Sequence, residues 1–208
     1  MSWKAETSYS TAIFPLAVNE GAEGALIEAR NQYSPLAKAL HWAVAAIVIG
    51  LIPVGLIMAD LKPGPLQDRL FVLHESFGVT LLALMVLRAV TRWRRRPAPY
   101  PGLEPWERRL STGVHHALYA LLLFTPVIGW LALSAYGLGP AFFGVAELPR
   151  LLPKDEPLSK ILFPIHETSA LLIAGLATLH VAGALRHALV KRDDLIWRML
   201  PAVFGKKS

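Results

Sequence analysis

The sequence predicts an all-α integral membrane protein built as a bundle of four spanning helices. Charged residues make up only 17% of the 208 residues, whereas hydrophobic residues make up 54%. Average soluble chains carry about 25% charged residues. Four stretches each hold the roughly 20 mainly apolar residues that cross a bilayer as a helix. Helices are favoured over a barrel because the stretches lack strand alternation and a backbone in lipid must satisfy its own hydrogen bonds.

The four predicted spans are separated by polar or glycine-containing connectors. We expect the spans at residues 36–58, 70–90, 112–135 and 163–189. The first carries no formal charge after Lys38, and the third ends where Gly137 and Gly139 break the helical pattern. The sequence therefore predicts one membrane domain over residues 33–201, with an N-terminal tail at 1–32 and a C-terminal tail at 202–208.

Basic residues outside the spans are concentrated on two segments. The connector between the second and third spans holds six arginines, and the segment after the fourth span holds further Lys and Arg. The other two connectors are nearly neutral. Because basic loops stay in the cytoplasm, both termini are predicted to be cytoplasmic. We interpret the run Arg92 to Arg96 as a topology signal that contacts anionic lipid, so no nucleic-acid partner is expected.

The chain contains no cysteine. This excludes disulfides, thiolate zinc sites, cysteine-ligated iron–sulfur clusters, covalently attached haem and cysteine nucleophiles. Any metal chemistry must therefore use the seven histidines.

Four of the histidines form two pairs when they are sorted by membrane depth. His166 and His180 lie 14 residues apart in the fourth span, which separates them by about 21 Å and keeps them within about 40° of one face. His41 lies near the cytoplasmic end of the first span, at the depth of His180. His74 lies near the outer end of the second span, at the depth of His166. The sequence thus predicts one His–His pair on each side of the bilayer midplane. We call His41 and His180 the inner pair, and His74 and His166 the outer pair.

Facing imidazoles at one depth between helices favour two non-covalent haem b groups, each with two histidine ligands. Zinc is less favoured because each pair lacks a third and fourth protein ligand. Hydrogen-bonded packing histidines and a His-lined proton or ion transporter are the alternatives. Gly78 and Gly183 lie within a turn of a paired histidine, where they would admit a flat macrocycle or allow close helix packing.

Further polar residues are predicted at the cytoplasmic side of the inner pair. Arg88 lies 14 residues after His74, so it would either face haem propionates there or reach the membrane interface. His187 and His115 would lie at the cytoplasmic edge of the inner haem. There they would donate hydrogen bonds to propionates or to a quinone and exchange protons. His116 is about 100° round the helix from its neighbour and is predicted to be interfacial.

These segments together resemble the bacterial cytochrome b561 family of four-helix di-haem membrane proteins over about residues 33–201. The resemblance rests on the order of several short motifs and on the 14-residue histidine spacing. The motifs are Leu40-His41-Trp42, His74-Glu75-Ser76-Phe77-Gly78, His115-His116-Ala117-Leu118-Tyr119, Pro126-Val127-Ile128-Gly129-Trp130, His166-Glu167-Thr168, Leu179-His180-Val181 and Arg186-His187.

The resemblance implies a haem ligand role for each of the paired histidines. His41 and His180 would ligate the iron of a cytoplasmic-side haem, and His74 and His166 that of a periplasmic-side haem. His187, and with it His115, would lie near a quinone site. The resemblance also implies an inner-membrane electron carrier of the respiratory chain, which passes electrons from a periplasmic donor to ubiquinone.

Two versions of this function follow from the resemblance. One is an oxidoreductase similar to superoxide oxidase, which takes electrons from superoxide. The other is a cytochrome b subunit or partner of a periplasmic dehydrogenase, and a complex with a redox protein or with further copies of the chain is left open. Glu75 follows His74 where many relatives carry Lys, and this departure disfavours an anionic donor.

Overall fold

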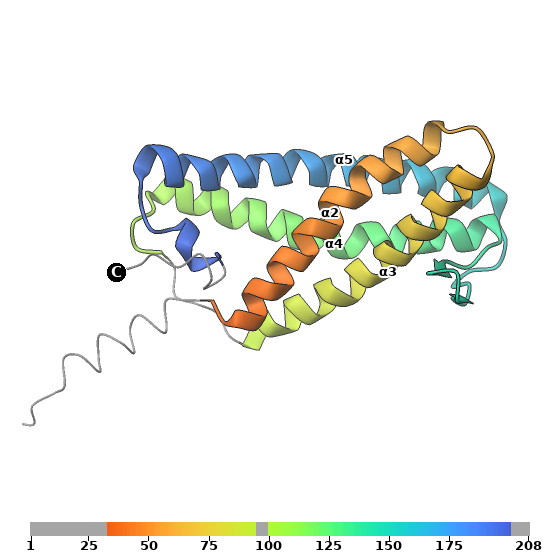
Figure 1. Cartoon of the computed structure of the whole chain (residues 1–208), viewed down its shortest axis with the longest axis horizontal. Helices are drawn as coiled ribbons and strands as arrows, with labels where there is room; N and C mark the ends of the chain where they lie inside the picture. Colours follow the sequence, from red (N-terminus) through yellow and green to blue (C-terminus); the bar gives the residue numbers. More distant parts are fainter. Residues whose placement is uncertain (1–32, 95–99, 201–208) are drawn as a thin grey trace, which may run out of the picture.

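The computed structural model describes residues 33–94 and 100–200. The two predicted tails lie outside the described residues, as do Arg95 and Arg96 of the basic connector. The described chain consists mainly of four long helices, namely α2 (Pro35–Asp60), α3 (Pro65–Arg94), α4 (Pro105–Tyr136) and α5 (Glu156–Leu185) (Figure 1). This arrangement confirms the predicted all-α four-helix membrane bundle.

The helix ends follow from local sequence. Proline begins α2, α3 and α4, where its fixed φ suits the first helical turn and its missing N–H costs nothing. Before α2, the Ser34 hydroxyl accepts a hydrogen bond from the Ala37 amide at 3.2 Å. Before α5, the Asp155 carboxylate caps the Leu158 amide in the same way at 3.0 Å. Helix α4 ends at Gly137, whose φ of 112° is the left-handed conformation that glycine adopts freely.

Each helix is long and apolar enough to cross a bilayer. Helices α2, α3 and α4 contain 26, 30 and 32 residues, and α5 with its continuation to Lys191 contains 36. Large apolar side chains face outward along them, as Ile49 does with 73% of its surface exposed and Leu172 with 55%. Residues 36–58, 70–90 and 112–135 lie inside α2, α3 and α4, and the fourth predicted span, 163–189, begins in α5 and ends in its continuation. The additional turns extend each helix beyond its apolar part.

The core lies at the middle of the bundle. The helices pack chiefly as two pairs, α2 with α3 and α4 with α5, and the pairs meet mainly where α3 contacts α4 (Figure 1). Buried apolar side chains from all four helices meet there, and they are Val44, Val48, Leu81, Met85, Leu122 and Ile173. In sequence, Ile173 lies midway between His166 and His180. The packed core therefore separates the two predicted histidine depths.

A short hairpin follows α4. Strands β1 (Ala141–Phe142) and β2 (Ala146–Glu147) pair in antiparallel fashion. The turn between them uses Phe143 at φ 50° and Gly144 at φ 70°. The sequence did not predict these strands, because two residues per strand are too few for an alternating pattern.

Two side chains of α3 hold this hairpin. The Ala141 amide donates to the Glu75 carboxylate at 2.7 Å. The Phe143 amide donates to the Ser76 hydroxyl at 2.7 Å, and that hydroxyl donates to the Ala141 carbonyl at 3.1 Å. Since Glu75 and Ser76 directly follow His74, the hairpin is fixed beside the outer histidine pair.

The chain after α5 folds back over the opposite end of the bundle. Helix α5 continues as a π-helical turn, η1 (Arg186–Lys191), and a 3₁₀ turn, η2 (Ile196–Arg198), follows. The Trp42 indole donates to the Met199 carbonyl at 3.0 Å. This contact ties the end of the described chain to the first turns of α2, next to His41.

Candidate functional site

The structure brings the four predicted ligand histidines together in two pairs. The rings of His41 on α2 and His180 on α5 have centroids 6.2 Å apart and planes 73° apart. The rings of His74 on α3 and His166 on α5 have centroids 6.0 Å apart and planes 77° apart. Helix α5 contributes one ring to each pair, as its 14-residue spacing predicts.

These separations fit one metal atom between two imidazoles. Two metal–nitrogen bonds of about 2 Å each, together with the distance from each ring centre to its nitrogen, account for a centroid separation near 6 Å. No group of three or more His, Cys, Asp or Glu side chains that could hold a metal ion occurs among residues 33–94 and 100–200. A haem iron would need only two imidazoles from the protein here, because the macrocycle supplies the other nitrogens.

One of the paired histidines carries a buried nitrogen without a partner. The Nδ1 atom of His41 is buried and makes no hydrogen bond. An unpaired buried polar atom is costly. The donor set and the ring separations fit the predicted haem groups.

His166 is oriented by the neighbouring helix. Its Nδ1 lies 2.9 Å from the Thr125 carbonyl on α4. Because a carbonyl only accepts, Nδ1 carries the proton and Nε2 keeps its lone pair for a metal. The Thr125 hydroxyl donates to Ser169 at 3.0 Å, and the Ser169 hydroxyl donates to the His166 carbonyl at 2.8 Å. Outer-shell bonds of this kind fix the orientation of a ligand ring.

Two glycines that the sequence analysis did not assign lie against the outer pair. A Cβ at Gly129 would lie 2.8 Å from Nδ1 of His166, and a Cβ at Gly55 would lie 3.1 Å from Cε1 of His74. Both lie near the outer ends of their helices, at the depth of His74 and His166, so depth along the helix is the sequence signal that points to them. At Gly78 and Gly183, by contrast, a Cβ would meet nothing within 4 Å. No contact among the described residues therefore requires glycine at these two positions, where the sequence predicts room for a macrocycle or close helix packing.

Arg88 and His115 lie beside the inner pair. The His115 ring centroid is 5.0 Å from that of His180. One turn further along α4, the Tyr119 hydroxyl accepts a hydrogen bond from Nε of Arg88 at 2.9 Å. The Arg92 guanidinium lies over the same tyrosine ring at 5.6 Å. Tyr119 was not predicted as a site residue, although it lies four residues after His115.

His187 is buried at the same end, and its two ring nitrogens face carboxylates. Nδ1 lies 2.6 Å from Oδ2 of Asp193, and Nε2 lies 4.0 Å from Oε1 of Glu107. Only 6% of the His187 surface is exposed. His116 is exposed on α4, as an interfacial residue would be. Neither Glu107 nor Asp193 was predicted as a site residue. The cations that Glu107 binds are remote from it in sequence, and the contact of Asp193 with His187 depends on the local turn that joins them.

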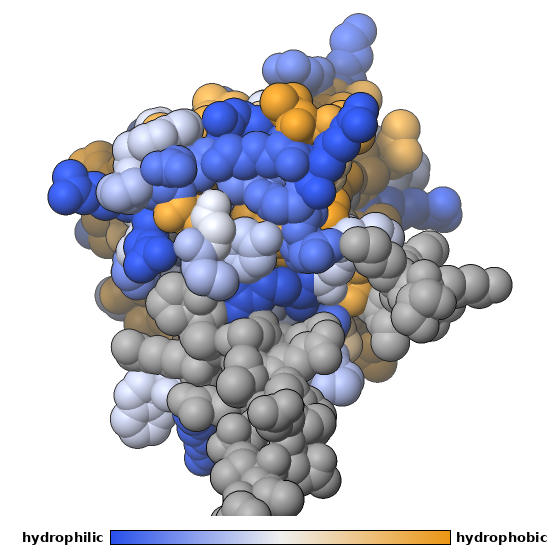
Figure 2. All heavy atoms as spheres, turned by 90° about the vertical axis from the view of Figure 1, so that its left-hand side faces the viewer, coloured by the Kyte–Doolittle hydropathy of each residue, from blue (hydrophilic) through white to orange (hydrophobic). Residues whose placement is uncertain are grey.

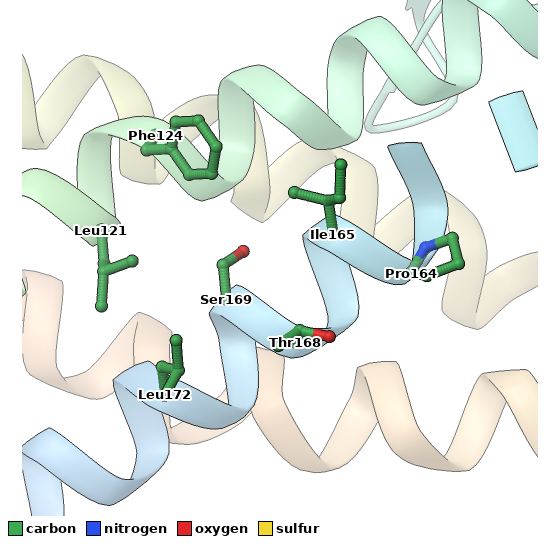
Figure 3. Close-up of a pocket in the computed structure, with 7 residues that line it drawn as sticks. All are labelled: Leu121, Phe124, Pro164, Ile165, Thr168, Ser169 and Leu172. Atoms are coloured by element: carbon green, nitrogen blue, oxygen red, sulfur yellow. The ribbon is translucent and has the colours of Figure 1, made fainter. Parts of the chain in front are cut away.

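An apolar groove lies on the lipid-facing surface between α4 and α5 (Figure 3). Leu121 and Phe124 line it from α4, and Ile165 and Leu172 line it from α5. It contains none of the predicted site residues. Its apolar lining suits an acyl chain of the surrounding lipid, and Ser169, whose hydroxyl donates to the His166 carbonyl, also lines it.

Comparison with known proteins gives the family of this chain. Residues 32–202 match the family model described as prokaryotic cytochrome b561. The chain is 30% identical over 182 residues to cytochrome b561 homolog 2 of Escherichia coli (strain K12), which covers 86% of this chain and 94% of that one. It is 27% identical over 179 residues to a Yersinia pestis protein named "Probable superoxide oxidase CybB", covering 84% and 99% of the two chains. It is also 27% identical over 176 residues to cytochrome b562 of Cereibacter sphaeroides, covering 81% and 94%.

Proposed function

Because this chain belongs to the prokaryotic cytochrome b561 family, and is thus a b-type cytochrome of electron transfer in the bacterial inner membrane, we propose that it is a di-haem carrier. It passes electrons from a periplasmic-side donor to ubiquinone in the membrane. The observation that carries this proposal is the presence of two separate His–His pairs at the two ends of one bundle.

The residues divide between two haem positions. His74 and His166 would hold the haem near the periplasmic side, and His41 and His180 would hold the one near the cytoplasmic side. A b-type haem with two imidazole ligands supplies reversible one-electron reduction. The protein's contribution is to set ligand identity, depth and surrounding charge.

The cytoplasmic end is the proposed acceptor side. Arg88 presents a guanidinium there, which suits a haem propionate. His115 and His187 supply imidazoles that would hand protons to a quinone during its reduction. Figure 2 looks onto this end of the bundle, where hydrophilic side chains gather. Positive residues in the connector before α4 support its cytoplasmic orientation.

Superoxide is the first candidate donor. The similarity to a protein named as a superoxide oxidase supports it. The balanced reaction joins two superoxide anions, one quinone and two protons to give one quinol and two molecules of oxygen. Each superoxide loses one electron, and the quinone gains both electrons and both protons.

A redox partner protein is the second candidate donor, and two observations on the outer side favour it. Glu75 places a carboxylate beside His74 and uses it to hold the hairpin amide of Ala141. The hairpin itself presents apolar side chains, with Phe143 half exposed and Val145 84% exposed. An anion is less attracted to such a surface than a protein with an apolar face.

The test uses purified protein with haem in lipid nanodiscs, a superoxide-generating system and a soluble ubiquinone analogue. We expect superoxide dismutase-sensitive quinol formation, and we expect the His187→Ala variant to lower the rate while the exposed-histidine control His116→Ala does not. If the chemically reduced protein fails to reduce the quinone, the proposed function is wrong. If it reduces quinone but superoxide does not reduce its haem, the partner-protein version replaces the superoxide version.

A further inference from the structure

A carboxylate is buried in the first turn of α4, where it contacts the chain beyond α5. Only 5% of the Glu107 surface is exposed. A buried carboxylate is costly unless it is paired and hydrogen-bonded. The partners of Glu107 therefore identify what this residue holds together.

Each oxygen of Glu107 binds a different cation of η1. Oε1 accepts from the Arg186 guanidinium, and Oε2 accepts from Nζ of Lys191 at 2.7 Å. Oε2 also accepts from the backbone amide of Glu104 at 3.1 Å, which fixes the carboxylate to its own helix. One side chain thus joins the start of α4 to both ends of η1.

This double contact depends on the π-helical geometry of η1. Arg186 and Lys191 are five residues apart. In an α-helix, five residues would separate their directions by about 140°. The i→i+5 bonding of a π-turn brings residues five apart to the same side. The π register therefore brings both cations to one carboxylate.

His187 is part of the same turn. It follows Arg186 directly and lies on the buried side, with its Nδ1 2.6 Å from Asp193. The Asp193 amide donates back to the His187 carbonyl at 3.3 Å, and Arg192 between them takes a left-handed φ of 54°. The direction of the His187 ring therefore depends on the register of η1 as well as on Asp193.

We propose that Glu107 is a positioning residue, whose carboxylate holds η1 in its π register and thereby orients His187 at the acceptor side of the inner histidine pair. This rests on the proposed function in one respect, namely that His187 acts on the quinone. The structural part, that Glu107 fixes the turn, is independent of any activity.

The test compares Glu107→Gln, Glu107→Asp and a matched control, Glu156→Gln, in the full chain with haem bound. Glu156 is also a first-turn glutamate, but it pairs with Lys160 on the exposed surface at 3.0 Å. In Glu107→Gln we expect hydrogen exchange of the amides at 187–192 to rise about tenfold, and KM for a soluble ubiquinone analogue to rise about tenfold. The rate of haem reduction by dithionite should stay unchanged. Glu107→Asp keeps the carboxylate, so its rises in hydrogen exchange and in KM should be smaller. Glu156→Gln should show neither rise.

Unchanged hydrogen exchange in a folded Glu107→Gln variant would overturn the proposal. If that variant does not fold, Lys191→Gln removes one arm of the contact and leaves Arg186 in place, and it should raise the exchange of the same amides. Normal exchange in Lys191→Gln would likewise overturn it. If wild-type protein does not reduce the quinone at all, the proposed function fails, while hydrogen exchange still decides the role of Glu107.

Discussion

At the residue scale, the paired histidines are held by different neighbours. The Nδ1 of His166 donates to the Thr125 carbonyl on α4, whereas the Nδ1 of His41 is buried without a partner. His180 contacts the ring of His115. Groups on α4, one of the backbone and one of a side chain, therefore contact both pairs, although α4 contributes no ring to either.

Replacement of Gly129 by alanine tests how closely α4 supports the outer pair. The added methyl carbon would lie 2.8 Å from Nδ1 of His166. The ring must shift and lose its bond to Thr125, which we expect to cost about 1–3 kcal/mol as overpacking does. The measurement is haem bound per chain, and we expect the outer haem to be lost or weakened.

The control for this substitution lies on the same helix. A Cβ at Gly113 would meet nothing within 4 Å, so Gly113→Ala should bind haem normally and gain about 0.5–1 kcal/mol of helix stability. Equal haem content in the Gly129→Ala and Gly113→Ala proteins would contradict the role assigned to Gly129.

The residue-level pairing was predictable because it depends only on helix rise and on where each span begins. His166 and His180 share a face at 14 residues, and each partner follows from its depth. The contacts of Glu107 and Tyr119 were not predictable in this way. They depend on which faces of two helices meet, and one sequence does not specify the rotation of a helix about its axis.

At the scale of elements, the four helices were predictable and the smaller elements were not. Length and hydropathy determine a spanning helix, and the prolines and Gly137 mark its ends. The hairpin is held by contacts between residues that are at least 65 positions apart in sequence, such as the contact of Glu75 with Ala141. The π-turn contacts Glu107, which is 79 residues from Arg186 in sequence.

Ser76→Ala tests the attachment of the hairpin to α3. The Ser76 hydroxyl is fully buried and accepts from the Phe143 amide at 2.7 Å. Without it that amide loses its partner, which costs about 1–3 kcal/mol. We expect faster hydrogen exchange at residues 141–147 and faster proteolysis of the hairpin.

Thr178→Ala is the matched control, because the Thr178 hydroxyl is exposed and donates only to a carbonyl of its own helix. It should leave the hairpin unchanged. Hairpin exchange that is the same in the Ser76→Ala protein as in the wild type would show that the strands are held by other contacts.

At the scale of the whole molecule, the absence of cysteine allows a direct test of orientation. A single introduced cysteine is the only thiol in the chain. Val145 on the hairpin and Pro101 in the connector before α4 are both exposed and lie at opposite ends of the bundle. Since the basic connector should stay in the cytoplasm, we expect an impermeant maleimide to label Val145→Cys in intact spheroplasts.

The Pro101→Cys protein should be labelled only after the membrane is permeabilised. The reverse pattern would place the basic end outside and would exchange the proposed donor and acceptor sides. Labelling of both variants in intact cells would contradict a single orientation.

The central claim for the whole molecule is that each histidine pair holds one haem. The most direct measurement is haem b per chain, determined from reduced-minus-oxidised and pyridine haemochrome spectra of the wild type, His74→Ala, His41→Ala and the exposed control His116→Ala. We expect two haems in the wild type and in His116→Ala, and one in each of the other two variants, with different α-bands remaining. One haem in the wild type, or two in His74→Ala, would contradict this claim.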